Sequence, residues 1–366
     1  MNIIISGGGT GGHIYPALAI VDEIKKRYKD ANILYVGTEK GLESEIVPEH
    51  GVPFKTISAK GLPRKKLNVK TFKTAMSLYK GLRQCDKIIK EFKPDVVIGT
   101  GGFVCAPIVM KAQRKKIKTV ISEQNAYPGI TNKILSKKAD LVAINFDEAK
   151  EYFDNENIVF TGNPIRSDFE KIDKDEAFKR LGVKNDMPIV LSFGGSGGQE
   201  STNDAIIEII KSRTELPFRL IHITGKVHYK NFMEEIKGID LPENIKILDY
   251  SHKIPDLLKI SDLVVASSSA MTLAEISAVG VASILIPKSY TAGNHQFFNA
   301  KSYENKGASI VIKESDLSGE VLLDSIESLL MDKNKLEKMG SSSKELASVD
   351  AVKKLVDEIL KVIDEK

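Results

Sequence analysis

The most informative stretch of the sequence joins a short apolar run to a helical pattern near the N-terminus. Within "ISGGGTGGHIYPALAI", Gly7, Gly9 and Gly12 follow the G-x-G-x-x-G spacing of a dinucleotide-binding loop. Such glycines allow backbone N–H groups to approach an anion at the start of a helix. His13 stands in the first helical turn, where the positive end of the helix dipole favours a neutral imidazole. A neutral imidazole beside a phosphate-sized opening can act as a base or a hydrogen-bond donor, although a histidine that merely caps the helix is the simpler alternative.

A second glycine-rich turn occurs at "FGGSGGQ", residues 193–199, after another apolar run. Its backbone N–H groups and the hydroxyl of Ser196 are suited to an anion. The turn lacks the Gly-Lys-Ser/Thr ending of a P-loop, which argues against ATP hydrolysis. The chain therefore has two anion-binding turns and no P-loop lysine. This indicates that it binds a diphosphate substrate and does not hydrolyse a nucleotide.

Two helix starts in the second half carry polar groups that suit a nucleotide sugar. "ASSSAMTLAEI" places Glu275 in the first or second turn of a helix, where its carboxylate can accept both hydroxyls of a ribose. "AGNHQFFNA" places His295 or Gln296 on one helix face with Asn299, and amides and imidazoles are suitable partners of sugar hydroxyls. Taken one by one, each is equally consistent with a polar helix start that binds nothing.

The sequence offers little to a metal ion. "DKD", residues 173–175, has a D-x-D spelling, but it lies in a charged run that is typical of a solvated helix start. No His or Cys cluster has the spacing of metal ligands. We therefore expect neither a metal site nor another cofactor.

The strands and helices that position these motifs can be predicted from the sequence. The order of apolar runs and helical patterns is typical of parallel α/β sheets. Short apolar runs alternate with longer helical patterns, and a strand, a glycine-rich turn and a helix start occur in succession near residue 2 and again near residue 188. This predicts two Rossmann-like domains whose ligands bind at the carboxyl ends of the strands, in a cleft between the domains. We expect these domains over residues 1–163 and 164–345, with a C-terminal helix in 346–366 that packs back on the first domain.

The composition is that of a soluble globular protein. The chain has 366 residues, of which 42% are hydrophobic and 28% charged, and no apolar run approaches the length of a membrane span. The N-terminus lacks the pattern of a signal peptide. Cys85 and Cys105 are too few for a disulfide framework, which predicts a cytoplasmic protein.

The net charge of +4 conceals a strongly basic segment. Residues 60–93 contain eleven Lys or Arg against two acidic residues, a local net charge of +9. Apolar residues recur every three or four positions along 69–92, which predicts a helix with a core-facing stripe. The surrounding side chains could still bind an anionic lipid surface. We expect this membrane patch to comprise Lys65, Lys66, Leu67, Lys70, Phe72, Lys73, Leu78 and Lys80.

Six motifs occur in order over nearly the whole chain, namely "GGGTGGHIYPALA", "GTGGFVCAPIV", "SEQNAYPGITNK", "TGNPIR", "SFGGSGG" and "SSAMTLAEI". In this combination the chain resembles the MurG family of glycosyltransferase family 28, the UDP-N-acetylglucosamine (UDP-GlcNAc) transferases that convert lipid I to lipid II in peptidoglycan synthesis. The resemblance implies an α/β fold of the GT-B type, with two Rossmann-like, doubly wound parallel-sheet domains facing across a cleft.

The same resemblance implies an inverting, metal-independent transfer of GlcNAc that uses no cofactor. The acceptor would be the C4 hydroxyl of MurNAc on undecaprenyl-pyrophosphoryl-MurNAc-pentapeptide, which is lipid I. The N-terminal domain would bind lipid I and the anionic inner leaflet at the cytoplasmic face of the cell membrane, as a peripheral protein. The C-terminal domain would bind UDP-GlcNAc.

The resemblance also assigns roles to single residues. His13 would be the base that activates the acceptor, or a group that positions it, with Glu123 as the second candidate for the base. Thr10 to Gly12 would face the acceptor pyrophosphate and the donor sugar, and Ser251 would mark the loop that holds uracil. The complete donor-binding set would be Thr10, Gly11, Gly12, Asn125, Arg166, Ser196, Ser251, Ala270, Met271, Thr272, Glu275, His295, Gln296 and Asn299.

Two departures from the family pattern lie near the nucleotide. The family usually reads "GGSxGA" at the second turn, where this chain reads "GGSGGQ". It usually has an arginine and a glycine in "SRSGA" or "CRSGA", where this chain has Ser267 and Ser269. These changes remove a cation and a hinge, so they bear on donor affinity and not on the class of reaction.

Three other functions would use part of the same pattern. A non-hydrolysing UDP-GlcNAc 2-epimerase shares the fold and the donor, but it needs no acceptor and no basic face. A dehydrogenase needs a ribose-binding acid at the end of the second strand, where this chain has Gly37 and Thr38. A nucleic-acid-binding protein would use the basic patch, but the chain has no Trp and lacks a helix-turn-helix or RNA-binding signature, so we expect no nucleic-acid partner.

Overall fold

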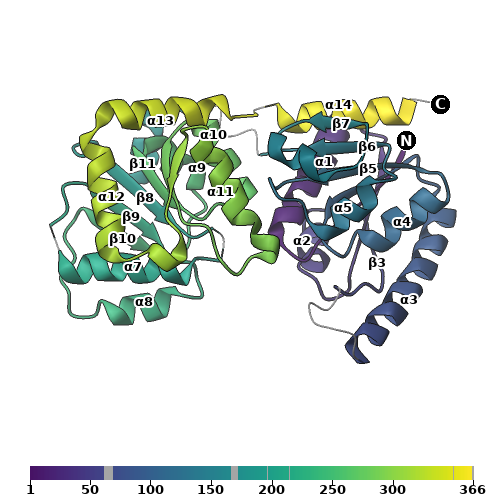
Figure 1. Ribbon diagram of the computed structural model, residues 1–366, viewed down its shortest axis with the longest axis horizontal. Coiled ribbons are helices and arrows are strands. Elements are labelled where there is room, and N and C mark those ends of the chain that lie inside the picture. The colour runs from purple at the N-terminus through teal and green to yellow at the C-terminus, as the bar shows by residue number, and fades with distance from the viewer. Residues whose placement is uncertain (62–68, 166–171, 196, 214, 349, 365–366) are drawn as a thin grey trace. The chain divides into compact units, whose positions relative to one another are not determined.

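The chain forms two compact units (Figure 1). Unit 1 comprises Met1–Ile165 and Asp350–Lys366, and unit 2 comprises Arg166–Val349. The structure is a computed structural model, and for residues 69–75 it describes the backbone alone. The described residues are 1–61, 69–165, 172–195, 197–213, 215–348 and 350–364.

Unit 1 is built on a seven-stranded parallel sheet with the strand order β3-β2-β1-β4-β5-β6-β7. Strands β1 and β4 are neighbours although β2 and β3 lie between them in the sequence, so the order reverses at this point. The loops after β1 and β4 therefore flank the crevice where open α/β sheets bind their ligands. The strands are β1 (Asn2–Gly7), β2 (Asn32–Gly37), β3 (Phe54–Thr56), β4 (Val96–Gly101), β5 (Lys118–Glu123), β6 (Leu141–Ile144) and β7 (Ile158–Phe160).

Helices cover both faces of this sheet, which is why its strands are nearly continuous apolar runs. Alternate residues of β1 enter different cores: Ile3 and Ile5 pack in one core, whereas Ile4 packs in the other. The C-terminal helix belongs to the first of these cores, because its apolar face packs there together with α1. The helices are α1 (Gly11–Arg27), α2 (Glu43–Glu49), α3 (Val69–Phe92), α4 (Ala106–Arg114), α5 (Ile130–Ser136), the 3-10 helix η1 (Asp147–Tyr152) and α14 (Ala351–Asp364).

Unit 2 repeats this plan with a six-stranded parallel sheet in the order β10-β9-β8-β11-β12-β13. Its order reverses between β8 and β11, so the second glycine-rich turn, which follows β8, also lies at the reversal. The predicted α/β fold, with two doubly wound parallel sheets, is confirmed. The strands are β8 (Ile189–Phe193), β9 (Arg219–Ile223), β10 (Ile245–Leu248), β11 (Leu263–Ala266), β12 (Ala282–Leu285) and β13 (Ser309–Val311).

Four helices of unit 2, namely α6, α10, α12 and α13, begin at conventional capping residues. Asp173, Ser269, Ser318 and Asp332 each accept a hydrogen bond from a backbone N–H group in the first turn of the helix that follows. Among the described helices of both units, none combines the length and the apolar character that a membrane span requires. The helices are α6 (Lys174–Leu181), α7 (Glu200–Ser212), α8 (Tyr229–Glu235), α9 (Ile254–Ile260), α10 (Ala270–Val279), η3 (Ala292–Asn294), α11 (His295–Asn305), η4 (Glu314–Asp316), α12 (Gly319–Met331) and α13 (Lys333–Glu345).

Candidate active site

In unit 1, the imidazole of His13 is held in one orientation at the reversal point of the sheet. It lies in the first turn of α1, and its Nδ1 is 3.0 Å from the carbonyl oxygen of Thr100, near the end of β4. A carbonyl oxygen only accepts, so Nδ1 must carry the proton. In the neutral ring the other nitrogen, Nε2, then has a free lone pair. The half-buried side chain is therefore set up to accept a proton at Nε2.

Gln124 supports the same tautomer from a second strand. Its Oε1 lies 3.2 Å from His13 Nδ1, while its amide nitrogen donates to the carbonyl oxygen of Ser122 at 3.1 Å. Because the amide nitrogen faces Ser122, the oxygen faces the imidazole. The hydroxyl of Thr100 also donates to the carbonyl oxygen of His13, at 2.7 Å. The end of β4 and the residue after β5 thus fix a side chain at the start of α1.

Gly101 is required for this contact. Its backbone φ is +113°, and a Cβ built there would lie 2.6 Å from His13 Nδ1. Any larger residue would therefore displace the ring and strain the backbone.

Glu123, the second candidate for the base, is fully engaged as an acceptor. It is buried at the end of β5, and its Oε1 accepts from the backbone and side-chain nitrogens of Asn125 at 3.0 and 3.1 Å. Its Oε2 accepts from the Gly129 N–H at 3.1 Å and from Asn132 Nδ2 at 2.8 Å. This arrangement favours a role in shaping the 124–129 loop over proton transfer. It also brings Asn125 into the same loop system as His13.

A buried carboxylate that sequence reasoning missed lies under the first glycine-rich loop. Glu43 is completely buried, accepts from the Gly9 N–H at 3.1 Å, and accepts from the backbone N–H of Thr38, also at 3.1 Å. A Cβ on Gly8 would lie 2.6 Å from this carboxyl group. Some glycines of the loop therefore make room for a carboxylate, and the Gly9 N–H is not available to an external anion. The N–H groups that remain for one are those of Thr10 to Gly12 at the start of α1.

In unit 2, the loops after β8 and β11 touch at the reversal point of the sheet. A Cβ on Gly195, which follows β8, would lie 3.3 Å from the hydroxyl of Ser267, which follows β11. Ser269, one of the two departures from the family pattern, caps α10 by accepting from the Thr272 N–H at 3.2 Å. The first N–H groups of α10, at Ala270 and Met271, have no acceptor within the helix and can face an anion.

Three predicted sugar-binding and ribose-binding residues lie on α10 and α11. Glu275 is half-buried in the second turn of α10. Gln296 is buried, and its Oε1 accepts from the Lys288 N–H at 3.0 Å, which leaves its amide nitrogen as the donor for a ligand. Asn299 is fully buried, and its amide nitrogen donates to the carbonyl oxygen of Ser268 at 3.1 Å. Asn299 therefore ties α11 to the loop after β11.

His295 and Ser251 occupy more open positions. His295, at the start of α11, has its Nδ1 2.8 Å from the carbonyl oxygen of Ala292. Ser251 follows β10 and lines a cavity of about 310 Å³ together with Tyr250 and Leu257. This cavity lies wholly within unit 2, in the loop region predicted to hold the base.

Several predicted residues lie outside the described part of the chain. They are Arg166 and Ser196 of the donor set, and Lys65, Lys66 and Leu67 of the membrane patch. Lys70, Phe72 and Lys73 belong to α3, but their side chains are not described. Leu78 is half-buried and Lys80 exposed on the same helix.

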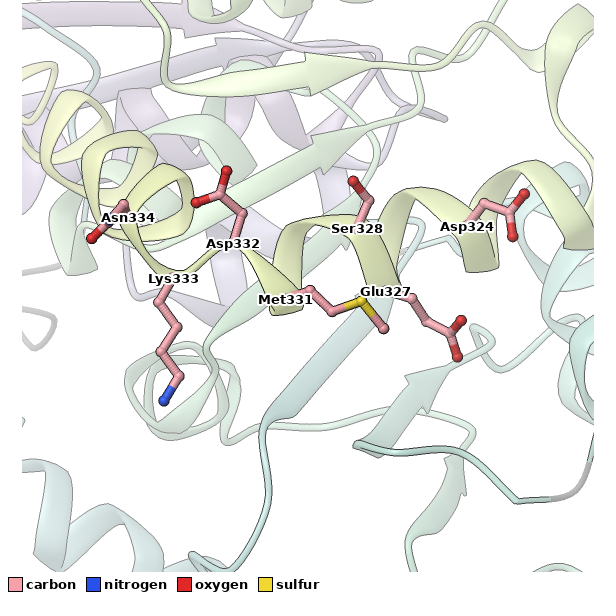
Figure 2. A pocket seen from close by; sticks show the side chains of 7 residues that line it. All are labelled: Asp324, Glu327, Ser328, Met331, Asp332, Lys333 and Asn334. Carbon is pink, nitrogen blue, oxygen red and sulfur yellow. The ribbon is translucent and has the colours of Figure 1, made fainter.

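A cavity of about 760 Å³ in unit 2 is lined by none of the strand-end loops discussed above. Figure 2 shows that its walls come from the end of α12 and the start of α13, with carboxylates on the α12 side. It brings together no ligand-binding loop, and among the described residues no group of three or more His, Cys, Asp or Glu could hold a metal ion. Its lining residues are Asp324, Glu327, Ser328, Met331, Asp332, Lys333 and Asn334.

Two tandem parallel-sheet units with glycine-rich loops at both reversal points have the architecture of the GT-B fold. Solved structures agree with this fold. MurG from Acinetobacter baumannii superposes with a TM-score of 0.79 at 24% identity, covering 98% of this chain and 99% of that one. A putative UDP-N-acetylglucosamine 2-epimerase from Listeria monocytogenes superposes with a TM-score of 0.69 at 15% identity, covering 100% and 97%. The fold alone therefore does not separate transferases from epimerases.

Sequence comparison separates them. The profile of the glycosyltransferase family 28 N-terminal domain matches residues 3–144, and that of the C-terminal domain matches residues 189–355. A protein of Finegoldia magna is 47% identical over 100% of this chain and 99% of its own length. One of Alkaliphilus oremlandii is 45% identical over the full length of both. Both bear the name UDP-N-acetylglucosamine–N-acetylmuramyl-(pentapeptide) pyrophosphoryl-undecaprenol N-acetylglucosamine transferase.

The chain belongs to glycosyltransferase family 28 and, within it, to the MurG family. It is therefore a glycosyltransferase, as the six motifs predicted.

Proposed function

We propose that this protein transfers GlcNAc from UDP-GlcNAc to the C4 hydroxyl of MurNAc on lipid I, giving lipid II. The observation that carries the proposal is the orientation of His13, whose Nδ1 is held by Thr100 and Gln124 so that Nε2 is free to take a proton. The relatives at 45–47% identity, which are named for this reaction, support the same substrates.

The chemical step is a single displacement at the anomeric carbon with inversion. The acceptor O–H bond breaks as its proton passes to His13 Nε2, and the acceptor oxygen forms a bond to the anomeric carbon. The bond from that carbon to the β-phosphate oxygen breaks, and UDP leaves with the bonding electrons. Positioned acid–base groups of this kind typically contribute about 10²–10⁴ in rate.

Unit 2 has the groups that a nucleotide-sugar donor needs. The start of α10, capped by Ser269, presents N–H groups and a positive dipole end to the diphosphate. Glu275 lies in the second turn of the same helix, and we assign its carboxylate to the ribose hydroxyls. Gln296 offers an amide donor to the sugar. We assign Arg166, Ser196, His295 and Asn299 to the same donor site by their positions in the family motifs.

The first test is transfer of labelled GlcNAc from UDP-GlcNAc to a short-chain lipid I analogue in the presence of EDTA. Product formation is the expected result, because the leaving group is stabilised by N–H groups and helix dipoles. Conversion of UDP-GlcNAc to UDP-ManNAc without transfer would assign the chain to the epimerases, the alternative that shares its fold.

We also propose that α3 docks unit 1 on the anionic face of the membrane. Met76 and Tyr79 are each 59% exposed on this helix, and the Arg83 guanidinium lies 4.9 Å from the Tyr79 ring centroid. Exposed apolar side chains among cations suit the boundary between headgroups and acyl chains. We expect the protein to sediment with anionic vesicles, and added salt should weaken this binding. Met76→Ser and Tyr79→Ser should also weaken it. Absence of binding at low salt would contradict the proposal.

A further inference from the structure

A lysine in the loop after β12 extends back to the second glycine-rich loop. Lys288 Nζ donates to the carbonyl oxygen of Gly198 at 2.7 Å, and the Lys288 backbone N–H donates to Gln296 Oε1 at 3.0 Å. One residue thus contacts both the turn after β8 and the amide that we assign to the sugar. Its side chain is half-buried, and burial lowers the pKa of Lys288 although Glu314 opposes the shift.

The position of this ammonium group is unfavourable for the protein on its own. Gly198 directly precedes Gln199, the N-cap of α7, so the cation lies near the positive end of that helix dipole as well as being partly desolvated. Cations are normally found at the opposite end of a helix. A bound anion would remove this conflict.

The nearby acidic residue is already engaged by other donors. Glu314 Oε1 accepts from Gln199 Nε2 at 2.8 Å and from the Ser201 hydroxyl at 2.7 Å, and its Oε2 accepts from the Ser289 N–H at 2.7 Å. Although burial raises the pKa of Glu314, these hydrogen bonds bring it below its ordinary value. Within the described part of the chain, Gly198 provides the one hydrogen bond to the Lys288 ammonium, so two of its three N–H donors are open.

We propose that Lys288 binds the diphosphate of the donor nucleotide and stabilises the charge that develops on it as the sugar leaves. The inference rests on the proposed function, because it takes UDP-GlcNAc as the donor. The turn after β8 and the loop after β11, which leads into α10, approach each other at Gly195 and Ser267, and Lys288 adds a cation to the turn after β8. An ammonium group is a compact point charge that suits a phosphate.

The proposal also accounts for the departures from the family pattern. Ser267 stands where an arginine is usual, so a cation is missing from the loop after β11. Gln199 stands where alanine is usual, and its amide nitrogen bonds the carbonyl oxygen of Ile286 at 3.2 Å, which joins the start of α7 to the segment that bears Lys288. Lys288 therefore places a cation beside the turn after β8, on a segment that is joined to the start of α7.

The test compares two ligands that differ only in the diphosphate. Calorimetric titration of UDP and of uridine into the full chain is carried out with the wild type, Lys288→Met, Lys288→Arg and the control Lys333→Met, an exposed lysine on α13. Because one charged hydrogen-bonding group is removed, Lys288→Met should lower UDP affinity by about 10- to 100-fold. Uridine affinity should stay within about twofold, Lys288→Arg should retain most of the UDP affinity, and Lys333→Met should match the wild type.

The possible failures are distinguishable. Equal losses for UDP and uridine would mean that Lys288 only shapes the loop, and unchanged UDP affinity would mean that it does not reach the diphosphate; either result overturns the inference and leaves the proposed function standing. Failure of the wild type to bind UDP would overturn the proposed function itself. If Lys288→Met does not fold, as judged by circular dichroism, Lys288→Gln takes its place in the comparison.

Discussion

The two units place different chemistry on one backbone plan. Each has a parallel sheet whose order reverses beside its first strand, and each has a glycine-rich turn at that reversal. In unit 1 the turn leads to His13, which is oriented by carbonyl oxygens and has a free Nε2. In unit 2 the corresponding region presents helix N–H groups, hydroxyls and the ammonium group of Lys288. The topology decides where a ligand binds, and a few side chains decide whether that ligand gains a base or a set of charge-stabilising donors.

The two units also differ in how each surrounds a histidine, His222 in unit 2 and His13 in unit 1. His222, on β9, is fully buried, with Nδ1 3.0 Å from the Ser192 hydroxyl and Nε2 3.0 Å from Asn203 Oδ1. Both of its nitrogens are engaged inside the protein, and burial lowers the pKa of His222 to about 3. His13 is half-buried, and within the described ranges only its Nδ1 has hydrogen-bond partners. Only the second arrangement allows proton exchange with a substrate.

The largest effect is expected from His13→Gln. The amide can still donate to the Thr100 carbonyl, but it cannot accept a proton, so kcat should fall by about 10²–10⁴ while the KM for UDP-GlcNAc changes little. Steady-state kinetics with the lipid I analogue measures both. The matched control is His50→Gln, because His50 is exposed and pairs with Asp22 at 2.8 Å. Near-normal turnover of His13→Gln would exclude His13 as the base.

Gly101→Ala should have the next largest effect. The new Cβ would lie 2.6 Å from His13 Nδ1, and a displacement of about 1 Å in a reacting group can cost about 10²-fold in rate. Gly51→Ala separates ring displacement from backbone strain, since Gly51 has a φ of +73° but no atom within 4 Å of its built Cβ. Both variants should lose some stability, whereas only Gly101→Ala should lose activity. Equal activities would show that the imidazole orientation is unimportant.

A third prediction concerns His222 and the stability of unit 2. The ordinary pKa of histidine is about 6.5. Below that pH, His222 binds a proton in the unfolded chain but not in the native one, so the free energy of unfolding falls as the pH is lowered. The contribution of His222 to the free energy of unfolding should be fully present above about pH 6.5. It should be smaller by about 2 kcal/mol at pH 5, because each pH unit below the unfolded pKa changes this free energy by about 1.4 kcal/mol.

Urea unfolding at pH 7 and pH 5 tests this for the wild type and His222→Gln, which cannot take up that proton. The wild type should lose more stability on acidification than the variant. Parallel losses in the two proteins would contradict the prediction.

Much of the fold is predictable because parallel strands buried on both faces are short apolar runs separated by helical patterns. "NIIIS" and "PIVLSF" are such runs, and each is followed by a glycine-rich turn. His13 was predictable as a candidate because it stands in such a turn. Its orientation was not, since Thr100 and Gln124 are 87 and 111 residues away in the sequence and meet it only through strand pairing.

Glu43 and Lys288 show why other residues of the site cannot be predicted from the sequence. Glu43 begins α2 and resembles an ordinary first-turn acidic residue until the fold places it under Gly9. Lys288 resembles a solvated loop lysine until β12 and β8 bring it to Gly198. Burial and tertiary approach give these residues their roles, and neither is encoded in local spacing. Glu123 shows the converse, because a carboxylate in a conspicuous motif proves to be saturated with donors.

The smallest effect is expected from Gln296→Glu in unit 2. The variant keeps an oxygen that can accept from the Lys288 N–H, so the loop after β12 should retain its position. It loses the amide donor assigned to the sugar, and one such hydrogen bond corresponds to about 1 kcal/mol, or roughly fivefold in the KM for UDP-GlcNAc. The KM for the lipid I analogue should be unchanged, and the melting temperature should fall slightly because the new carboxyl group is buried. A shift in the melting temperature with no change in donor KM would make Gln296 a support for the loop, and the donor contacts of unit 2 would then reduce to its helix N–H groups, Glu275 and Lys288.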